Sequence, residues 1–319
     1  MKKTSIGGQA LLEGVMMRGP GKFAAVVRTP GGLLAREESA PFPKERHPVL
    51  GWVFVRGVCN FVQSLSIGMK ALFWSADQIA DEPGGAGGAG KEEPKGLGKG
   101  LFALSMGLAL VLVVGLFTLL PTFLSGLVPA FQTGDAELPV SLNFLRNLFE
   151  TALRLVILLL YMVLVSRTKD IQRTFAYHGA EHKSIACYEA GEELTVANAR
   201  RFSRFHPRCG TSFLLTVVLV SMVAFLLLSL PLQMLHWNSV ILRVAARLAL
   251  LPFVVAVSYE LNRLVGRSEN VLSRAVRAPG LLMQRLTTRE PDDGMLEVAL
   301  DALKRVVPAE EGADAWGTE

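Results

Sequence analysis

The chain has 319 residues, of which half are hydrophobic and 19% are charged, and its mean hydropathy is +0.37. These values exclude an intrinsically disordered or fibrous protein, and the grouping of apolar residues in blocks predicts an integral membrane protein with smaller soluble parts. The net charge of +5 does not indicate nucleic-acid binding, because Lys and Arg flank the apolar blocks instead of forming a continuous basic stripe. Residues 1–19 lack the continuous apolar core of a cleaved signal peptide.

The N-terminal region, residues 1–47, predicts a small β-meander. Short strand-like stretches between residues 7 and 38 are separated by turn signals at 19–21 and 29–32. The second signal has proline at the second position of the turn and glycine at the third, which is a favoured arrangement.

Residues 48–80 predict an amphipathic helix that lies in the membrane interface. The alternative, a fifth and poor membrane span, is left open by the sequence. The segment is apolar apart from polar side chains that share one helical face, namely Arg56, Asn60, Gln63 and Lys70. Residues 81–100 follow as a flexible linker rich in Gly, Lys and Glu.

Four later segments are apolar over about 20 residues, the length that crosses a hydrocarbon core. They form two predicted transmembrane hairpins, residues 101–166 and residues 211–260. The fold class predicted is therefore mainly α, a polytopic membrane protein with about four transmembrane helices, a small N-terminal β-meander and an amphipathic interfacial helix. In the second span Arg146, Glu150 and Arg154 form one charged stripe, which should face protein or headgroups and not lipid.

The connection between the hairpins, residues 167–210, contains eight Lys or Arg residues, and the C-terminal segment, residues 261–319, is again rich in arginine. By the positive-inside rule, this connection and both termini are predicted to be cytoplasmic. In the C-terminal segment, a helix over 295–306 is expected, capped by Asp292 or Asp293, with an apolar face that needs a docking surface.

Three of the five histidines lie in the connection between the hairpins, together with a cysteine. His178 and His182 are four residues apart, so in a helix their rings project from one face about 6 Å apart and can hold one ion. Glu181 completes the H-x-x-E-H order of the inverted zincins, in which two histidines bind Zn²⁺ and the glutamate acts as a base. Downstream, His206 and Cys209 add an imidazole and a thiolate three residues apart.

The sequence therefore predicts a divalent metal site, with zinc expected and His178, His182, His206 and Cys209 as ligands. A closed set of four protein ligands is more typical of structural zinc, whereas catalytic zinc has three protein ligands and an open position. The alternative without a metal is that these polar residues are satisfied at a headgroup surface. Glu260 is a further candidate ligand, although a charged residue at a helix end near Arg263 explains it as well.

Four motifs resemble, in the same order, those of the YqhQ-like family of bacterial membrane proteins. They are Gly7–Ala10 continued by Glu13–Pro20, then Tyr177–Lys183, His206–Ser212 and Thr287–Pro291. The resemblance covers nearly the whole chain outside the Gly-rich linker. It implies a multi-pass protein of the bacterial plasma membrane, and because members are often labelled predicted metal-dependent enzymes, it implies a metal without giving a reaction.

The function expected from the sequence is that of a zinc-dependent hydrolase acting at the cytoplasmic membrane face. Glu181 would take a proton from water and Arg208 would stabilise developing negative charge, so these two are the predicted catalytic residues. Besides the bilayer, the expected partners are a lipid-linked substrate or another membrane protein, and no nucleic acid. The alternative is a non-enzymatic assembly or quality-control factor for membrane proteins, with a structural metal site.

Overall fold

The computed structural model describes residues 3–80, 104, 107–108, 111–132, 139–234, 240–268, 270–310 and 312–316. The chain divides into two compact units. The first comprises Met1–Gly88, Ser166–Val218 and Pro252–Glu319, and the second comprises Ala89–Val165 and Leu219–Leu251. The predicted linker, residues 81–100, and the beginning of the first predicted span lie outside the described residues.

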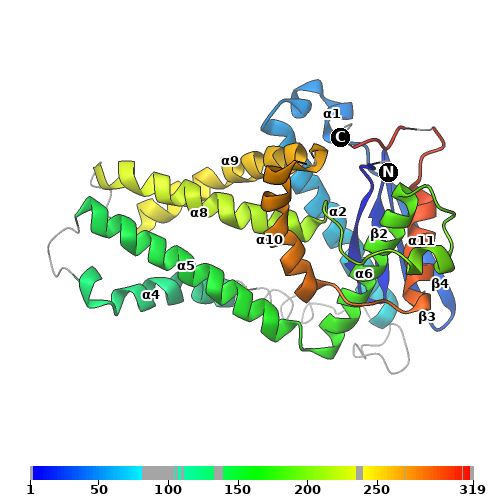
Figure 1. The fold of residues 1–319 in the computed structure, drawn as a ribbon, viewed down its shortest axis with the longest axis horizontal. Coiled ribbons are helices and arrows are strands. Elements are labelled where there is room, and N and C mark those ends of the chain that lie inside the picture. The colour runs from blue at the N-terminus through cyan, green and yellow to red at the C-terminus, as the bar shows by residue number, and fades with distance from the viewer. Residues whose placement is uncertain are drawn as a thin grey trace. The chain divides into compact units, whose positions relative to one another are not determined.

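The N-terminal strands form one antiparallel sheet in the order β1-β2-β3-β4, which confirms the predicted β-meander (Figure 1). Their bounds are β1 Gly7–Leu11, β2 Gly14–Arg18, β3 Lys22–Thr29 and β4 Gly32–Ser39. Thr29 pairs with Gly32, so Pro30 and Gly31 form the predicted tight turn between β3 and β4. The apolar run of β3 is continuous because both faces of the sheet are covered.

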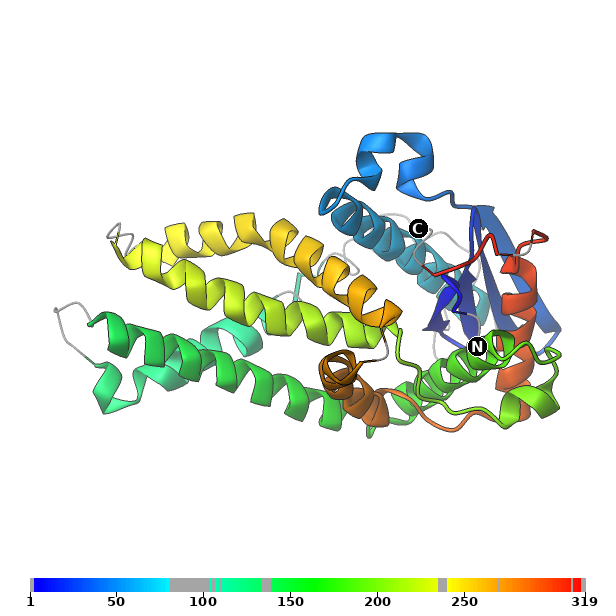
Figure 2. The same ribbon diagram turned by 45° about the horizontal axis from the view of Figure 1, so that its top comes forward.

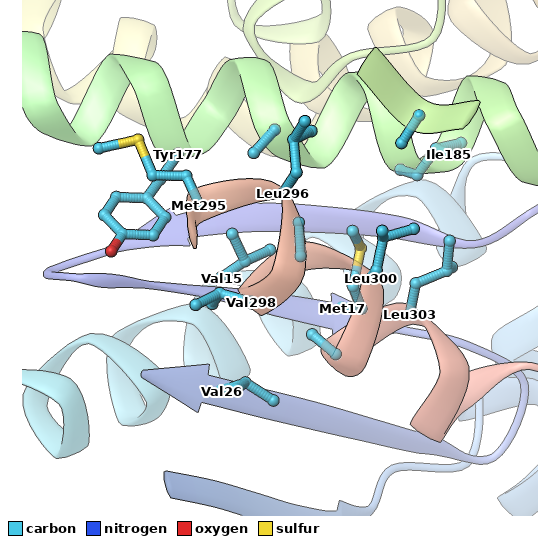
Figure 3. Packing of buried hydrophobic residues seen from close by; sticks show 14 of the residues in the cluster. Val15, Met17, Val26, Tyr177, Ile185, Met295, Leu296, Val298, Leu300 and Leu303 are labelled. Atoms are coloured by element: carbon cyan, nitrogen blue, oxygen red, sulfur yellow. The ribbon is translucent and has the colours of Figure 1, made fainter. Parts of the chain in front are cut away.

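One face of the sheet packs against two helices, α6 (Lys169–Glu189) and α11 (Asp293–Val306). Figure 3 shows Val15, Met17 and Val26 of the strands directed toward Leu296, Leu300 and Leu303 of α11, with Tyr177 and Ile185 of α6 beside them. The N-cap of α11 is Asp292, whose carboxylate accepts a hydrogen bond from the Met295 amide at 2.8 Å. The C-terminal helix and its docking surface are thus as predicted.

The other face of the sheet packs against α2 (Val55–Ala80), whose Ile67 and Ala71 are buried beside Phe23 and Val27. Three of the four polar residues predicted on one face of α2 contact the rest of the protein, whereas the fourth, Lys70, is exposed. Asn60 donates a hydrogen bond to the Tyr259 hydroxyl at 2.9 Å, Gln63 donates to the Pro41 carbonyl at 2.8 Å, and Arg56 forms an ion pair with Glu260 at 2.5 Å. On the opposite side of α2 large apolar side chains are exposed, including Val62, Leu65 and Phe73. The helix is amphipathic, as predicted, and Arg56, Asn60 and Gln63 of its polar face contact other parts of the protein. Its predicted position in the membrane interface stays a prediction.

Among the described helices, three are long and apolar enough to cross a membrane: Ser141–Val165, Ser212–Ser229 and Ala245–Arg267. They belong to α5 (Val140–Val165), α8 (Gly210–Met234) and α9 (Val240–Arg267). A shorter apolar helix, Val111–Gly126, belongs to the first predicted span. The chain is therefore a mainly helical membrane protein.

The remaining elements are α1 Pro43–Arg46, η1 Pro48–Gly51, η2 Gly115–Leu119, α4 Leu120–Gly126, η3 Pro129–Phe131, α7 Val196–Arg200 and α10 Val271–Thr287.

Residues near the two ends of the chain pair with each other, where the red C-terminal segment in Figure 2 runs back toward the strands of the sheet. Thr4 forms a β-bridge with Ala315, and the Trp316 amide donates a hydrogen bond to the Lys3 carbonyl at 2.9 Å. Three of the described helices are long and apolar enough to cross a membrane, and with the apolar helix at 111–126 they agree with the predicted total of about four.

In the second unit, the charged stripe of α5 is turned toward protein. Glu150 is 6% exposed and accepts a hydrogen bond from the Ser125 hydroxyl of α4 at 2.8 Å. Arg146 and Arg154, one turn before and after it, lie 3.3 and 3.5 Å from its carboxylate. A carboxylate in an apolar helix is stable only with such partners, and the pattern confirms that this side of α5 does not face lipid.

Candidate metal centre

The centre is built on α6 in the first unit, where His178 and His182 lie one turn apart. Their ring centroids are 4.4 Å apart, as the spacing in the sequence predicts for a helix. Cys209, immediately before α8, brings its Sγ to 3.1 Å from His178 Nε2. One ligand atom from each of the three residues lies within 4.8 Å of the others. These three residues form what we call the His-His-Cys cluster.

Backbone carbonyls orient both imidazole rings of the cluster. His178 Nδ1 lies 2.8 Å from the Thr287 carbonyl oxygen, and His182 Nδ1 lies 2.5 Å from that of Arg204. A carbonyl can only accept, so each Nδ1 carries a proton, and Nε2 is the ring nitrogen that can bind a metal once it is deprotonated. Metal-binding histidines generally have such an outer hydrogen bond.

The segment that follows α10 is held against α6 by a close backbone approach. The Arg289 amide donates to the Phe175 carbonyl at 2.8 Å, and a Cβ at Gly179 would lie 2.1 Å from the Arg289 carbonyl oxygen. Only glycine fits there. This approach places the Thr287 carbonyl beside His178, which gives the Thr287–Pro291 motif a structural role.

Glu181 lies on the same helix and is 4% exposed. Its Oε2 is 4.0 Å from His178 Nε2 and, among the described residues, has no hydrogen-bond partner. Burial raises the pKa of this carboxyl, against the lowering effect of His178 and His182. A Cβ at Gly8 of β1 would lie 2.9 Å from Glu181 Cγ, so the first motif keeps β1 clear of this side chain.

His178 and Cys209 stabilise each other's charged forms. Burial works against protonation of His178, but the hydrogen bond with Cys209 and the thiolate charge raise the pKa of the imidazole to about 9. Burial likewise works against ionisation of Cys209, yet the charge of His182 and the hydrogen bond with His178 hold the pKa of the thiol well below its usual value. Both effects favour the thiolate, which is the form of cysteine that binds metals.

His206 and Arg208, predicted as a ligand and a catalytic residue, both bind Glu189. His206 Nε2 lies 3.3 Å from Glu189 Oε2, and Arg208 forms an ion pair with the same carboxylate. The structure does not place His206 in the His-His-Cys cluster, although its ring centroid is 5.7 Å from that of His182. Glu260, the other candidate ligand, binds Arg56 instead, at 2.7 and 2.5 Å.

Glu189 was not singled out from the sequence, although it lies on the same face of α6, eleven residues after His178. It is 8% exposed and also accepts a hydrogen bond from the Thr4 amide at 2.8 Å. Gln284 of α10 fixes the backbone of His206 from the other side, with its amide group accepting at 2.9 Å and donating at 2.8 Å. These contacts join residues far apart in sequence, and no local pattern indicates them.

Glu189→Gln is expected to destabilise the protein, because Arg208 would then be buried without its carboxylate, which costs about 3–5 kcal/mol. Burial works to raise the pKa of Glu189, but the His206 hydrogen bond and the Arg208 charge outweigh it and lower the pKa below 4.5. The carboxylate's contribution to stability is thus complete above pH 4.5 and is lost as the pH falls through the lowered value. Thermal unfolding in an uncharged detergent over this pH range measures both effects.

The matched control is Glu297→Gln, since Glu297 is a surface residue with its side chain 58% exposed and paired to Arg28. Its effect should stay below about 1 kcal/mol, as for other surface ion pairs. Equal unfolding temperatures for Glu189→Gln and the wild-type chain at neutral pH would contradict the buried ion pair.

A family described as "Protein of unknown function (DUF1385)" matches residues 52–309. The chain is 35% identical over 309 residues to "Uncharacterized protein YqhQ" of Bacillus subtilis (strain 168), an alignment that covers 95% of this chain and 92% of that protein. This chain belongs to the DUF1385 family. The match extends through α6, Cys209 and α10, so all residues of the His-His-Cys cluster lie inside the family region. No solved structure matches the chain.

Proposed function

We propose that this DUF1385 protein is a zinc-dependent hydrolase at the cytoplasmic face of the bacterial plasma membrane. The proposal is supported chiefly by one observation: the cluster offers three protein ligands, His178, His182 and Cys209, while the fourth predicted ligand binds Glu189. Three ligands with an open position are typical of catalytic zinc, and four are typical of structural zinc. The donor set, two imidazoles and a thiolate, also suits Zn²⁺.

Glu181 is the proposed base. Its free, buried Oε2 lies beside the cluster and lines a cavity of about 350 Å³ into which a substrate and water can enter. When bound, Zn²⁺ supplies Lewis acidity. Glu181 takes a proton from the attacking water while the oxygen bonds to a carbonyl or phosphoryl centre. The ester bond then breaks, and Glu181 returns the proton to the leaving alcohol.

Arg208 also lines the cavity, immediately before Cys209 in the chain. Its guanidinium is fixed by Glu189 and lies over the Trp316 ring, 5.4 Å from the centroid. A fixed positive charge next to the reacting group can stabilise an oxyanion. The cytoplasmic orientation is supported by the basic connection between the hairpins.

The test is elemental analysis of the purified chain together with hydrolysis of a panel of chromogenic esters and phosphodiesters. We expect about one equivalent of zinc, and hydrolysis that a chelator abolishes and added Zn²⁺ restores. A chain purified without metal from zinc-replete cells, and unable to bind Zn²⁺ afterwards, would overturn the proposal.

A second candidate, a thiol hydrolase, is favoured by the 3.1 Å distance between Cys209 Sγ and His178 Nε2. Cys209 would be the nucleophile and His178 the base, oriented by the Thr287 carbonyl, and this arrangement needs no metal. In that case hydrolysis would resist chelators and be abolished by iodoacetamide. A folded chain that holds zinc but hydrolyses none of the substrates would instead favour the non-enzymatic assembly role with a structural metal site.

A further inference from the structure

The cavity next to the His-His-Cys cluster is lined by two chemically different groups of side chains. Its volume of about 350 Å³ falls in the range of small-molecule sites. Four arginines, Arg18, Arg208, Arg263 and Arg277, are among the lining residues, while Glu181 is the only carboxylate among the described residues that line the cavity. Arg208 is paired with Glu189, which lies outside the lining. Other lining residues are apolar, and Phe61, Phe213 and Val265 form what we call the apolar wall. The predominance of cationic over anionic side chains in the lining favours an anionic ligand.

Three buried donors on the polar side have no acceptor. Arg208 Nε, Asn262 Nδ2 and Trp316 Nε1 are buried nitrogen atoms without a hydrogen-bond partner in the part of the chain that the structure describes. A buried donor left unsatisfied costs about 1–3 kcal/mol, so native structures usually satisfy such donors with an ordered water or a ligand. All three residues line the cavity. A group with several acceptor oxygens, such as a phosphate, suits N–H donors of this kind.

The apolar wall is formed by the ends of helices that can cross a membrane. Phe213 and Val265 come from α8 and α9, and Phe61 of α2 lies beside Phe213 with ring centroids 5.8 Å apart. The outer side of α2 exposes Val62 and Leu65, 58% and 56% respectively, as expected for a helix in contact with lipid. A ligand that enters along these helices from the bilayer would bring an apolar chain to this wall.

We propose that the cavity binds a phosphate-bearing amphiphile, with its phosphate at Arg208, Asn262 and Trp316 and its apolar chain along Phe61 and Phe213. This inference rests on the proposed function, since it names the class of substrate that the hydrolase takes. Arg208, Cys209 and Glu181 all line the cavity, so a phosphate bound at Arg208 would share the cavity with the cysteine of the cluster and the proposed base.

The experiment is native mass spectrometry of the full chain in an uncharged detergent, with three probes. Dioctanoyl phosphatidate carries both phosphate and chains, dioctanoylglycerol carries the chains alone, and inorganic phosphate carries the charge alone. We expect one saturable equivalent of phosphatidate, with dioctanoylglycerol and inorganic phosphate each binding at least tenfold more weakly. Equal binding of dioctanoylglycerol would mean that the cavity binds only the apolar chains, and equal binding of inorganic phosphate would mean that the chains add nothing to binding. Either result would contradict the proposal.

Trp316→Phe combined with Asn262→Leu removes two of the donors but keeps side chains of similar shape, and it should weaken phosphatidate binding at least tenfold. The control is Trp52→Phe, because Trp52 is exposed and lies outside the cavity. The comparison of the three probes on the wild-type chain needs no variant, so it decides the question even if the double variant unfolds.

The two proposals fail separately. If phosphatidate binds a chain that holds no zinc, the hydrolase proposal fails and the lipid site stands. If zinc and hydrolysis are present but the affinities of the three probes do not follow the expected order, the lipid site fails and the hydrolase proposal stands. His178→Ala should lose zinc and retain phosphatidate, because His178 is not among the described residues that line the cavity.

Discussion

His178→Ala and Cys209→Ser are each expected to reduce bound zinc from about one equivalent to a small fraction of one. Each substitution leaves only two of the three ligands of the His-His-Cys cluster. Changing a residue that merely supports a ligand lowers metal affinity about 10–100-fold, so losing a ligand should lower it by more than about 100-fold. Elemental analysis of the purified variants after dialysis measures the loss.

Two matched controls separate loss of a ligand from loss of the fold. His47 is exposed and belongs to no described metal cluster, and Cys59 is a half-buried thiol on α2. His47→Ala and Cys59→Ser should keep the full zinc content.

His206→Ala tests whether the site has a fourth ligand. If it loses as much zinc as His178→Ala, then His206 turns from Glu189 to the metal, the site has four ligands, and a structural role becomes the better explanation.

The cluster could be predicted from sequence to the extent that it depends on local spacing. His178 and His182 are one helical turn apart, and this alone brings their rings together once residues 169–189 form α6. The β-meander and α11 were predictable for the same reason, because turn residues, alternation and an N-cap are local signals.

The number of ligands in the cluster depends on contacts between residues that are far apart in sequence. His206 and Cys209 are three residues apart, and the sequence treats them alike, yet Cys209 reaches His178 while His206 binds Glu189. The difference is made by Gln284, which holds the His206 backbone, and by the Thr4 amide and Arg208, which hold the Glu189 carboxylate. α10 itself was not predicted, because Pro279 inside the helix is read as a helix breaker in a sequence.

Glu181→Gln is expected to keep the zinc and the fold while lowering hydrolysis about 10²–10⁴-fold, the contribution of a general base. Glutamine has nearly the same shape as glutamate, so the tight fit against Gly8 is preserved. Glu181 is outside the three-ligand set, and its Oε2 forms no hydrogen bond with the described residues that the amide would break. The amide cannot accept a proton from water, and this alone removes the catalytic step.

The control for this variant is Glu192→Gln, a surface residue whose side chain is 46% exposed. It should retain both zinc and activity. Three measurements on Glu181→Gln, namely zinc content, unfolding temperature and hydrolysis rate, then distinguish the roles of the carboxylate. Full zinc with full activity would mean that Glu181 is not the base. Lost zinc would mean that its carboxylate is a fourth ligand, and a buried acid 4.0 Å from His178 Nε2 would then close the site that the proposed hydrolysis needs open.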